Sequence, residues 1–197
     1  QFDVTVVPGS LTIDKRDVVV AANDSSKTFG ATDPDFAATV TGEVEGEEGI
    51  IEYTVSRPGA DVDEAVGIYP DAIVAAGEAD QGNYKVTYEP ADFTITEQSI
   101  TPGPDPDDPD PSYDGITANS PENVPYNGFD QSWLPTVTDA DGKTLVKDVD
   151  YTVSYSTEDR TNVTGEIEVI ITGIGNYTGT IDGLTYEVTP APLTVVT

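Results

Sequence analysis

The sequence predicts an all-β protein made of two small antiparallel, sandwich-like modules in tandem. Apolar residues alternate with Thr, Ser, Asp or Glu in several segments, as half-buried strands do. These segments are residues 2–6, 84–88, 151–155 and 167–171. Gly, Pro, Asn and Asp stand between them, as expected of turns. A phrase that occurs three times also indicates repeated modules.

The repeated phrase occupies residues 1–13, 83–95 and 176–188, and the three copies align without a gap. Because its copies are cut unevenly, residues 1–14 are interpreted as the tail strand of an upstream repeat. Residues 191–197 are interpreted in the same way as the first strand of a downstream repeat. We therefore expect the chain to be a piece of a longer array, in which neighbouring repeats are its first partners.

A linker divides the chain. Residues 101–111 read TPGPDPDDPDP, a composition that prevents sheet pairing and favours an extended, self-repelling spacer. The predicted modules are therefore residues 1–100 and 112–197, each close to the usual size of a domain.

Turns and one ambiguous segment complete the prediction. Pro8-Gly9 and Pro58-Gly59 mark turns, while Asn127-Gly128 and Asp141-Gly142 favour tight hairpins. Residues 63–81 are compatible with a helical turn or two, although Pro70 and Gly77 limit its length. A β-grasp-like α+β fold is therefore the alternative for the first module.

Composition excludes several functions. The chain has 8 Lys and Arg against 37 Asp and Glu, a formal net charge of −29, which repels nucleic acid and anionic membranes. It contains no Cys and no His, so disulfides, thiolate nucleophiles, imidazole bases and the usual zinc ligands are absent. No segment is apolar for long enough to insert into a membrane. We expect a monomeric protein that is not an enzyme.

Acidic residues are the weak candidates for a metal site, because Ca²⁺ prefers carboxylate and carbonyl oxygens. The candidates are Asp139, Asp141, Asp148 and Asp150 in the second module, with Asp33 and Asp35 in the first. No EF-hand loop is present, and the alternative is a solvated acidic surface that keeps a β-protein soluble. Calcium is thus the one cofactor to consider, and no other is expected.

Aromatic residues and lysines carry the remaining alternatives. Tyr84 and Tyr177 each follow an Asn; they either stack on a sugar or, as we favour, pack inward at the start of a strand. The single Trp133 is either a ligand anchor or a core residue. Lys27, Lys143 and Lys147 could form an intramolecular isopeptide bond, but their turn-like surroundings predict exposure.

The first module contains Ser26-Lys27-Thr28-Phe29-Gly30, followed by Asp33-Pro34, Gly67-Ile68-Tyr69 and residues 83–88. Through these motifs it resembles the MBG repeats of bacterial surface adhesins, with Phe29 where Tyr is usual. The second module is similar to another tandem repeat of cell-wall-anchored proteins, through DYTVSY at 150–155 and GNYTGT at 175–180. These resemblances imply a non-catalytic stalk or spacer on the bacterial cell surface, anchored to the cell wall. The alternative is an adhesive module whose exposed Tyr or Trp binds a glycan or a host protein.

Overall fold

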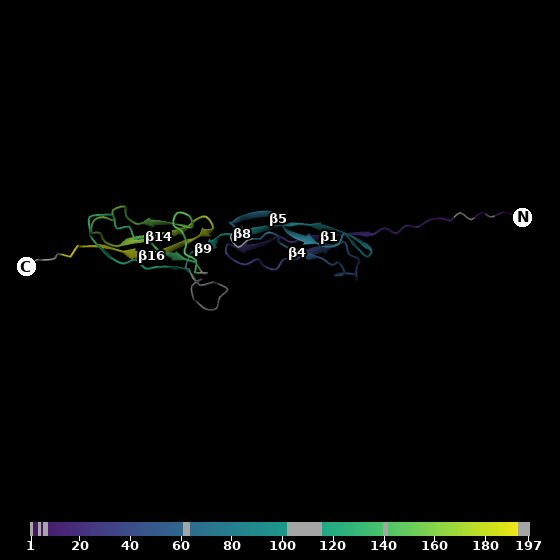
Figure 1. Ribbon diagram of the computed structural model, residues 1–197, viewed down its shortest axis with the longest axis horizontal. Coiled ribbons are helices and arrows are strands. Elements are labelled where there is room, and N and C mark those ends of the chain that lie inside the picture. Colours follow the sequence, from purple (N-terminus) through teal and green to yellow (C-terminus); the bar gives the residue numbers. More distant parts are fainter. Residues whose placement is uncertain are drawn as a thin grey trace, which may run out of the picture. The chain divides into compact units, whose positions relative to one another are not determined.

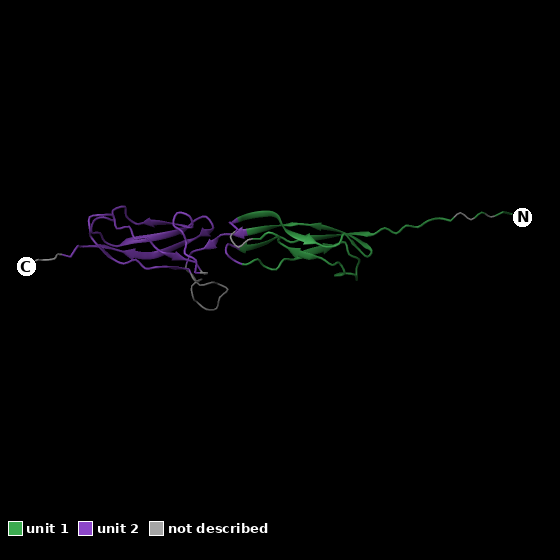
Figure 2. Ribbon diagram, viewed as in Figure 1, with its two compact units in different colours: residues 1–27, 32–62, 67–94 green, residues 28–31, 63–66, 95–197 purple. Residues whose placement is uncertain are grey.

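The computed structural model describes residues 2–3, 5, 8–60, 64–101, 116–139 and 142–192. These residues contain strands and no helix, which confirms the all-β class. The chain divides into two compact units, each described by itself (Figure 2). Unit 1 comprises residues 1–27, 32–62 and 67–94, and unit 2 comprises residues 28–31, 63–66 and 95–197. Residues 102–111 of the predicted linker lie outside the described residues.

Unit 1 is built from two four-stranded sheets (Figure 1). The first sheet has the order β3-β1-β7-β6, and its strands are β1 (Arg16–Ala22), β3 (Ala38–Thr41), β6 (Asp80–Gln81) and β7 (Tyr84–Glu89). The second has the order β2-β8-β5-β4, and its strands are β2 (Ser25–Thr28), β4 (Thr54–Ser56), β5 (Gly67–Ala76) and β8 (Ala91–Thr96). The last residues of β2 and β8 belong to unit 2. Strand β5 contacts both β1 and β7, so the two sheets face each other.

The core of unit 1 follows from the period-two alternation of its strands. Val18 and Val20 of β1 are buried, as are Tyr84 and Val86 of β7, while their neighbours in sequence turn outward. The opposite sheet contributes its own buried side chains, Ile73, Ala75 and Phe93. Burial of these apolar side chains stabilises the unit by roughly 25 cal/mol per Å² removed from water.

Unit 2 has one three-stranded sheet and three short pairs. The sheet has the order β13-β14-β16, with β13 (Tyr151–Tyr155), β14 (Ile167–Gly173) and β16 (Thr180–Tyr186). The pairs are β9 (Gln98–Ser99) with β15 (Tyr177–Thr178), β10 (Thr117–Ala118) with β12 (Val137–Thr138), and β11 (Val124–Pro125) with β17 (Val188–Thr189). A buried cluster of Ile167, Val169, Tyr186 and Val188 lies at the centre, with Trp133 and Tyr155 packed against it.

Strand direction differs from the expectation of purely antiparallel modules. Among the strand pairs whose register is described, three are parallel: β1 with β7, β9 with β15, and β11 with β17. Period-two alternation shows which face of a strand is buried but carries no information on the direction of its neighbour. The β3-β1-β7-β6 sheet of unit 1 is therefore mixed, whereas in unit 2 the parallel pairs are separate from the antiparallel β13-β14-β16 sheet.

Three local predictions were wrong. Residues 67–76 form β5, with Ile73 and Ala75 buried, so the helical turn and the α+β alternative are not supported. The predicted strand at 2–6 does not form in its described part, because Phe2 is 98% exposed and residues 2, 3 and 5 belong to no strand. The Asn127-Gly128 turn, with Gly128 at φ 83°, joins no hairpin, since β11 pairs with β17 and β12 with β10.

Candidate functional site

The acidic residues predicted as calcium ligands are engaged in local contacts. Asp139 is 4% exposed and accepts hydrogen bonds from the Tyr177 hydroxyl at 3.2 Å and the Lys143 N–H at 2.9 Å. Asp148 lies 2.8 Å from the Lys147 ammonium, and Asp150 accepts the Val146 N–H at 2.8 Å. Asp141 lies outside the described residues. Across the described part of the chain, no three His, Cys, Asp or Glu residues are grouped so that they could hold a metal ion.

Unit 1 contains a largely buried ion cluster formed by Lys27, Asp33 and Arg57. The Asp33 carboxylate accepts two hydrogen bonds from Arg57, each 2.8 Å long, and lies 2.9 Å from the Lys27 ammonium. The side chains of Lys27 and Arg57 are only 6% and 2% exposed. Arg57 also stacks on Phe93, its guanidinium carbon 4.2 Å from the ring centroid. The bond from Arg57, with Lys27 beside it, lowers the pKa of Asp33 to about 2.

This cluster corrects one prediction about the lysines. Lys27 was expected to be exposed, but it lies in β2 with its ammonium beside Asp33. Lys143 and Lys147 are exposed, as expected. An isopeptide bond needs a neutral amine and a protonated carboxyl group, whereas Arg57 keeps the Asp33 carboxylate ionised. The chemistry of this cluster is therefore that of an ion pair.

The tyrosines of the repeated phrase are core residues. Tyr84 and Tyr177 are 2% and 1% exposed, which confirms that they pack inward. Tyr177 packs edge-to-face on Phe29, with ring centroids 5.5 Å apart. The Tyr84 hydroxyl donates to Glu47 and accepts the Val44 N–H, and the bond to Glu47 raises the pKa of Tyr84. Neither ring is available to stack on a sugar.

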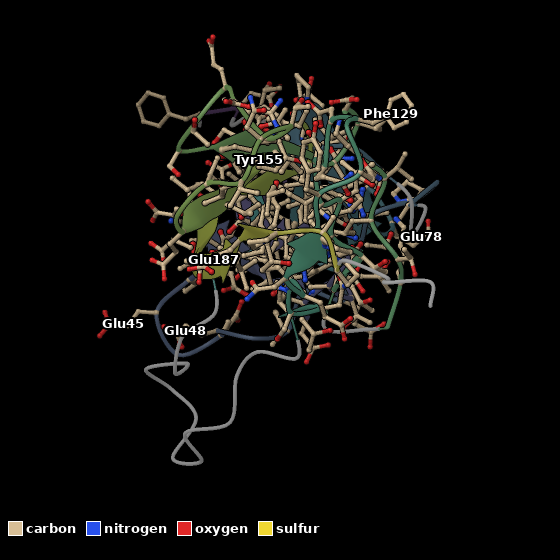
Figure 3. The ribbon with its side chains drawn as sticks, turned by 90° about the vertical axis from the view of Figure 1, so that its left-hand side faces the viewer. Glu45, Glu48, Glu78, Phe129, Tyr155 and Glu187 are labelled. Atoms are coloured by element: carbon tan, nitrogen blue, oxygen red, sulfur yellow. The ribbon has the colours of Figure 1, made fainter. Side chains whose placement is uncertain are left out.

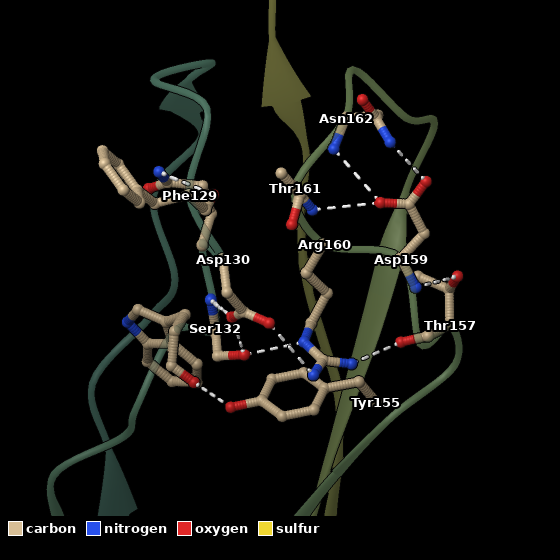
Figure 4. A network of polar contacts seen from close by, with 11 residues as sticks. Phe129, Asp130, Ser132, Tyr155, Thr157, Asp159, Arg160, Thr161 and Asn162 are labelled. Atoms are coloured by element: carbon tan, nitrogen blue, oxygen red, sulfur yellow. Dashed lines mark hydrogen bonds and ion pairs between the residues drawn. The ribbon is translucent and has the colours of Figure 1, made fainter.

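A polar network in unit 2 surrounds Arg160 (Figure 4). Its guanidinium donates to the Ser132 hydroxyl at 2.7 Å and to the Thr157 carbonyl at 2.7 Å. It also stacks on Tyr155, with the guanidinium carbon 4.5 Å from the ring centroid. Asp130 joins through an ion pair of 3.4 Å, and hydrogen bonds from Ser132 lower its pKa. The network fixes residues 130–132 against the loop at 157–162.

The loop at 157–162 is itself closed by Asp159. Its carboxylate accepts the Asn162 side-chain amide at 2.9 Å and the N–H groups of Thr161 and Asn162, and these bonds lower the pKa of Asp159. Trp133 is half-buried and packs on the core cluster of unit 2 through its ring, while its carbonyl accepts the Tyr155 hydroxyl at 2.7 Å. Of the two alternatives for Trp133, the structure supports packing against the core, with the side chain only half-buried.

Two exposed aromatic residues flank the Asn127-Gly128 turn. Tyr126 is 41% exposed and Phe129 is 75% exposed, and Phe129 projects from the surface in Figure 3. The Asn127 carboxamide accepts the Phe129 N–H at 2.9 Å, which closes the turn. Sequence analysis did not single out these residues as a site, although an Asn-Gly turn between two aromatic residues was the available signal. The Arg160 network had no such signal, because its partners lie about 30 positions apart, as with Asp130.

Unit 1 has an open groove along the ends of β4, β5 and β6, lined by Glu52, Tyr53, Glu78 and Asp80 among others. The Gln81 carboxamide lies in this region, donating to the Glu52 carbonyl at 2.8 Å and to the Tyr88 hydroxyl at 3.1 Å. The groove is thus an acidic surface with one half-exposed tyrosine, Tyr53 at 37%. It offers hydrogen-bond acceptors and an aromatic ring to solvent.

Comparison with known proteins gives a match, which lies within the first module. A family model described as MBG domain (YGX type) matches residues 18–94. No curated protein and no solved structure matches the chain. None of the described residues form a helix of the length and apolar character that crossing a membrane requires.

Proposed function

We propose, from the finding that residues 18–94 are an MBG domain of the YGX type, that this chain is a pair of non-catalytic spacer modules. They belong to a bacterial cell-surface protein of the adhesin or cell-wall-anchored kind. MBG domains are repeat domains of surface proteins, and the phrase repeated along this chain supports the same organisation. The chain works outside the cell, and its nearest partners are the neighbouring repeats.

The observation that carries this proposal is the burial of the tyrosines of the repeated phrase. The phrase supplies Tyr84 and Tyr177, and each is less than 3% exposed in the core of its own unit. Lys27 and Arg57, two of the chain's eight cations, are bound to Asp33 inside unit 1. What recurs from module to module therefore stabilises the modules. The large negative charge keeps neighbouring chains apart and soluble.

The test is a binding survey of the purified chain. It is applied to an array of host and environmental glycans and to host surface proteins, and a spacer shows no saturable binding. Antibodies against the chain should label intact cells of the source bacterium without permeabilisation. Saturable binding to one glycan or protein would overturn the spacer role, and labelling only after permeabilisation would overturn the cell-surface location.

A second function is favoured by the exposed turn of unit 2. Tyr126 and Phe129 present aromatic rings on a closed turn, a composition suited to stacking on a sugar or anchoring a host protein. For this adhesive function, Phe129→Ala would abolish the saturable binding. Leu134→Ala is the matched control, because Leu134 is also exposed, at 59%, but is not part of the turn.

A further inference from the structure

The topology of unit 1 places its first and last-but-one strands side by side and in the same direction. Strand β1 pairs in parallel with β7 over six residue pairs, from Arg16 with Tyr84 to Ala21 with Glu89. The chain enters the unit at the start of β1 and continues from the end of β7 into β8. In a parallel pair these two points lie at opposite ends of the ladder. We propose that the β1–β7 pair is a mechanical clamp that resists tension applied along the polypeptide.

The physical argument concerns how force reaches the hydrogen bonds. When tension pulls β1 toward its N-terminus and β7 toward its C-terminus, the two strands slide along each other. All bonds of the ladder then carry the tension together, because they are evenly spaced between two strands moving in opposite directions. Strands pulled apart from the same end separate one bond at a time. The sliding arrangement therefore raises the barrier to forced unfolding, which governs the unfolding rate under load.

Backbone contacts show which residues form the ladder. The Arg16 N–H donates to the Asn83 carbonyl at 2.9 Å, and the Val86 N–H donates away from β1, to the Ala79 carbonyl at 2.7 Å. Because successive residues of a strand direct their N–H and C=O groups to opposite sides, we expect Lys85, Thr87 and Glu89 to face β1. The antiparallel β3 borders β1 on its other edge, from Val19 with Thr41 to Ala22 with Ala38. Strand β1 is therefore held on both sides.

Side chains fasten the end of β1 at which tension arrives. Lys15 lies 3.0 Å from Asp80 of β6, and the Arg16 guanidinium donates to the Gly42 carbonyl at 2.5 Å. Gly42 has φ 99°, and a Cβ there would lie 2.6 Å from the Asp17 carbonyl oxygen, so glycine is needed for this close approach. On the inner face, Val18 and Val20 are at most 1% exposed, so extraction of β1 would also expose apolar surface to water.

This inference deepens the proposed function and rests on it, because only a chain that is pulled at both ends needs such a clamp. The experiment changes the direction of pulling within one protein. Since the sequence contains no Cys, two introduced cysteines can carry the handles of a single-molecule force instrument without competing thiols. One variant, D14C with E89C, attaches them at opposite ends of the β1–β7 ladder. The other, D14C with N83C, attaches them at the same end.

Asp14, Asn83 and Glu89 are all exposed, so both variants should fold with the same urea midpoint as the parent chain. At equal loading rate, we expect unit 1 to unfold at a several-fold higher force in the D14C/E89C variant than in the D14C/N83C variant. Equal forces in the two directions, or a higher force in the second, would overturn the clamp and leave the spacer proposal standing. Saturable ligand binding in the survey above would overturn the spacer proposal and leave the measured clamp intact.

Discussion

The Lys27 ammonium lies 2.9 Å from the Asp33 carboxylate, and the two side chains are 6% and 23% exposed. Arg57 directly follows β4, and its side chain is 2% exposed. Its Nε lies 2.8 Å from the same Asp33 carboxylate. The same carboxylate thus pairs with two cations whose side chains are withdrawn from water. Because isolated buried charges are costly, the stability of unit 1 depends on that acid more than on any exposed ion pair.

Asp33→Asn should destabilise unit 1 by about 2 to 4 kcal/mol, somewhat below the range for a fully buried pair because the carboxylate is partly exposed. The substitution removes the negative charge that both Lys27 and Arg57 contact. The matched control is Asp35→Asn, since Asp35 is an exposed acid two residues away. Urea unfolding measures the free energy of unfolding of both variants. An equal loss in the two variants would show that the cluster stabilises unit 1 no more than an exposed acid does.

The same cluster should make stability fall in strongly acidic solution. The pKa of Asp33 is about 2 in the folded protein, against 3.8 for an unperturbed group. Because the folded pKa is depressed, the Asp33 carboxylate contributes its full stabilising free energy only above the unfolded pKa of 3.8. This stabilisation is lost as the pH falls from there through the folded pKa of about 2. We expect a loss of about 1 to 2 kcal/mol over this window from the one carboxyl group, allowing for its partial exposure.

The measurement is the free energy of unfolding of the parent chain and of Asp33→Asn at several pH values between 4 and 2. The difference between the two proteins should shrink across this window as Asp33 becomes protonated in the parent chain. A difference that stays constant down to pH 2 would contradict the role given to this carboxyl group.

Tyr177→Phe tests the buried hydroxyl of the repeated phrase. The substitution removes the hydrogen bond to Asp139, which is 3.2 Å long and buried, while keeping the edge-to-face contact with Phe29. We expect a loss of about 1 kcal/mol, the usual net contribution of such a bond. Tyr126→Phe, at an exposed tyrosine, should change the urea midpoint little. An unchanged urea midpoint in Tyr177→Phe would mean that the Tyr177 hydroxyl makes no net contribution to stability.

Added salt should stabilise the chain, and calcium should have no larger effect than magnesium at the same ionic strength. A formal charge of −29 produces repulsion that added ions screen, since the Debye length falls from about 10 Å at 0.1 M to about 3 Å at 1 M salt. NaCl should therefore raise the melting temperature, and CaCl₂ and MgCl₂ at equal ionic strength should act alike. A calcium-specific increase that disappears in Asp150→Asn would reveal the site that the acidic residues first suggested.

Part of this structure could be predicted from the sequence, and physical reasons separate it from the rest. Strands β7, β13 and β14 fall on predicted segments because alternation records which side chains are buried. The parallel pairing of β1 with β7 could not be predicted, since its partners are 68 residues apart, as with Val18 and Val86. The exposure predicted for Lys27 was wrong, because its burial depends on contacts with residues that become its neighbours only in the folded chain, such as Asp33.

The candidate sites were less predictable than the strands. The tyrosines of the repeated phrase could be placed correctly, because Tyr84 and Tyr177 each begin a strand directly after an Asn that closes a turn. The contact of Arg160 with Asp130 and Ser132 joins loops on either side of β13, and no local pattern records it. Exposure of Phe129 at 75% follows from the shape of one turn, which composition does not describe.

The parallel pairing of β1 with β7 also has a consequence for how unit 1 is made. A ribosome synthesises β1 long before Tyr84–Glu89, so β1 must wait for its partner while more than 60 residues are added. Closing so large a loop is entropically costly and slows folding, as in other proteins rich in contacts between distant residues. Unit 1 should therefore fold in one late step, after β7 has emerged, and a nascent chain that ends before Tyr84 should remain unfolded and sensitive to protease.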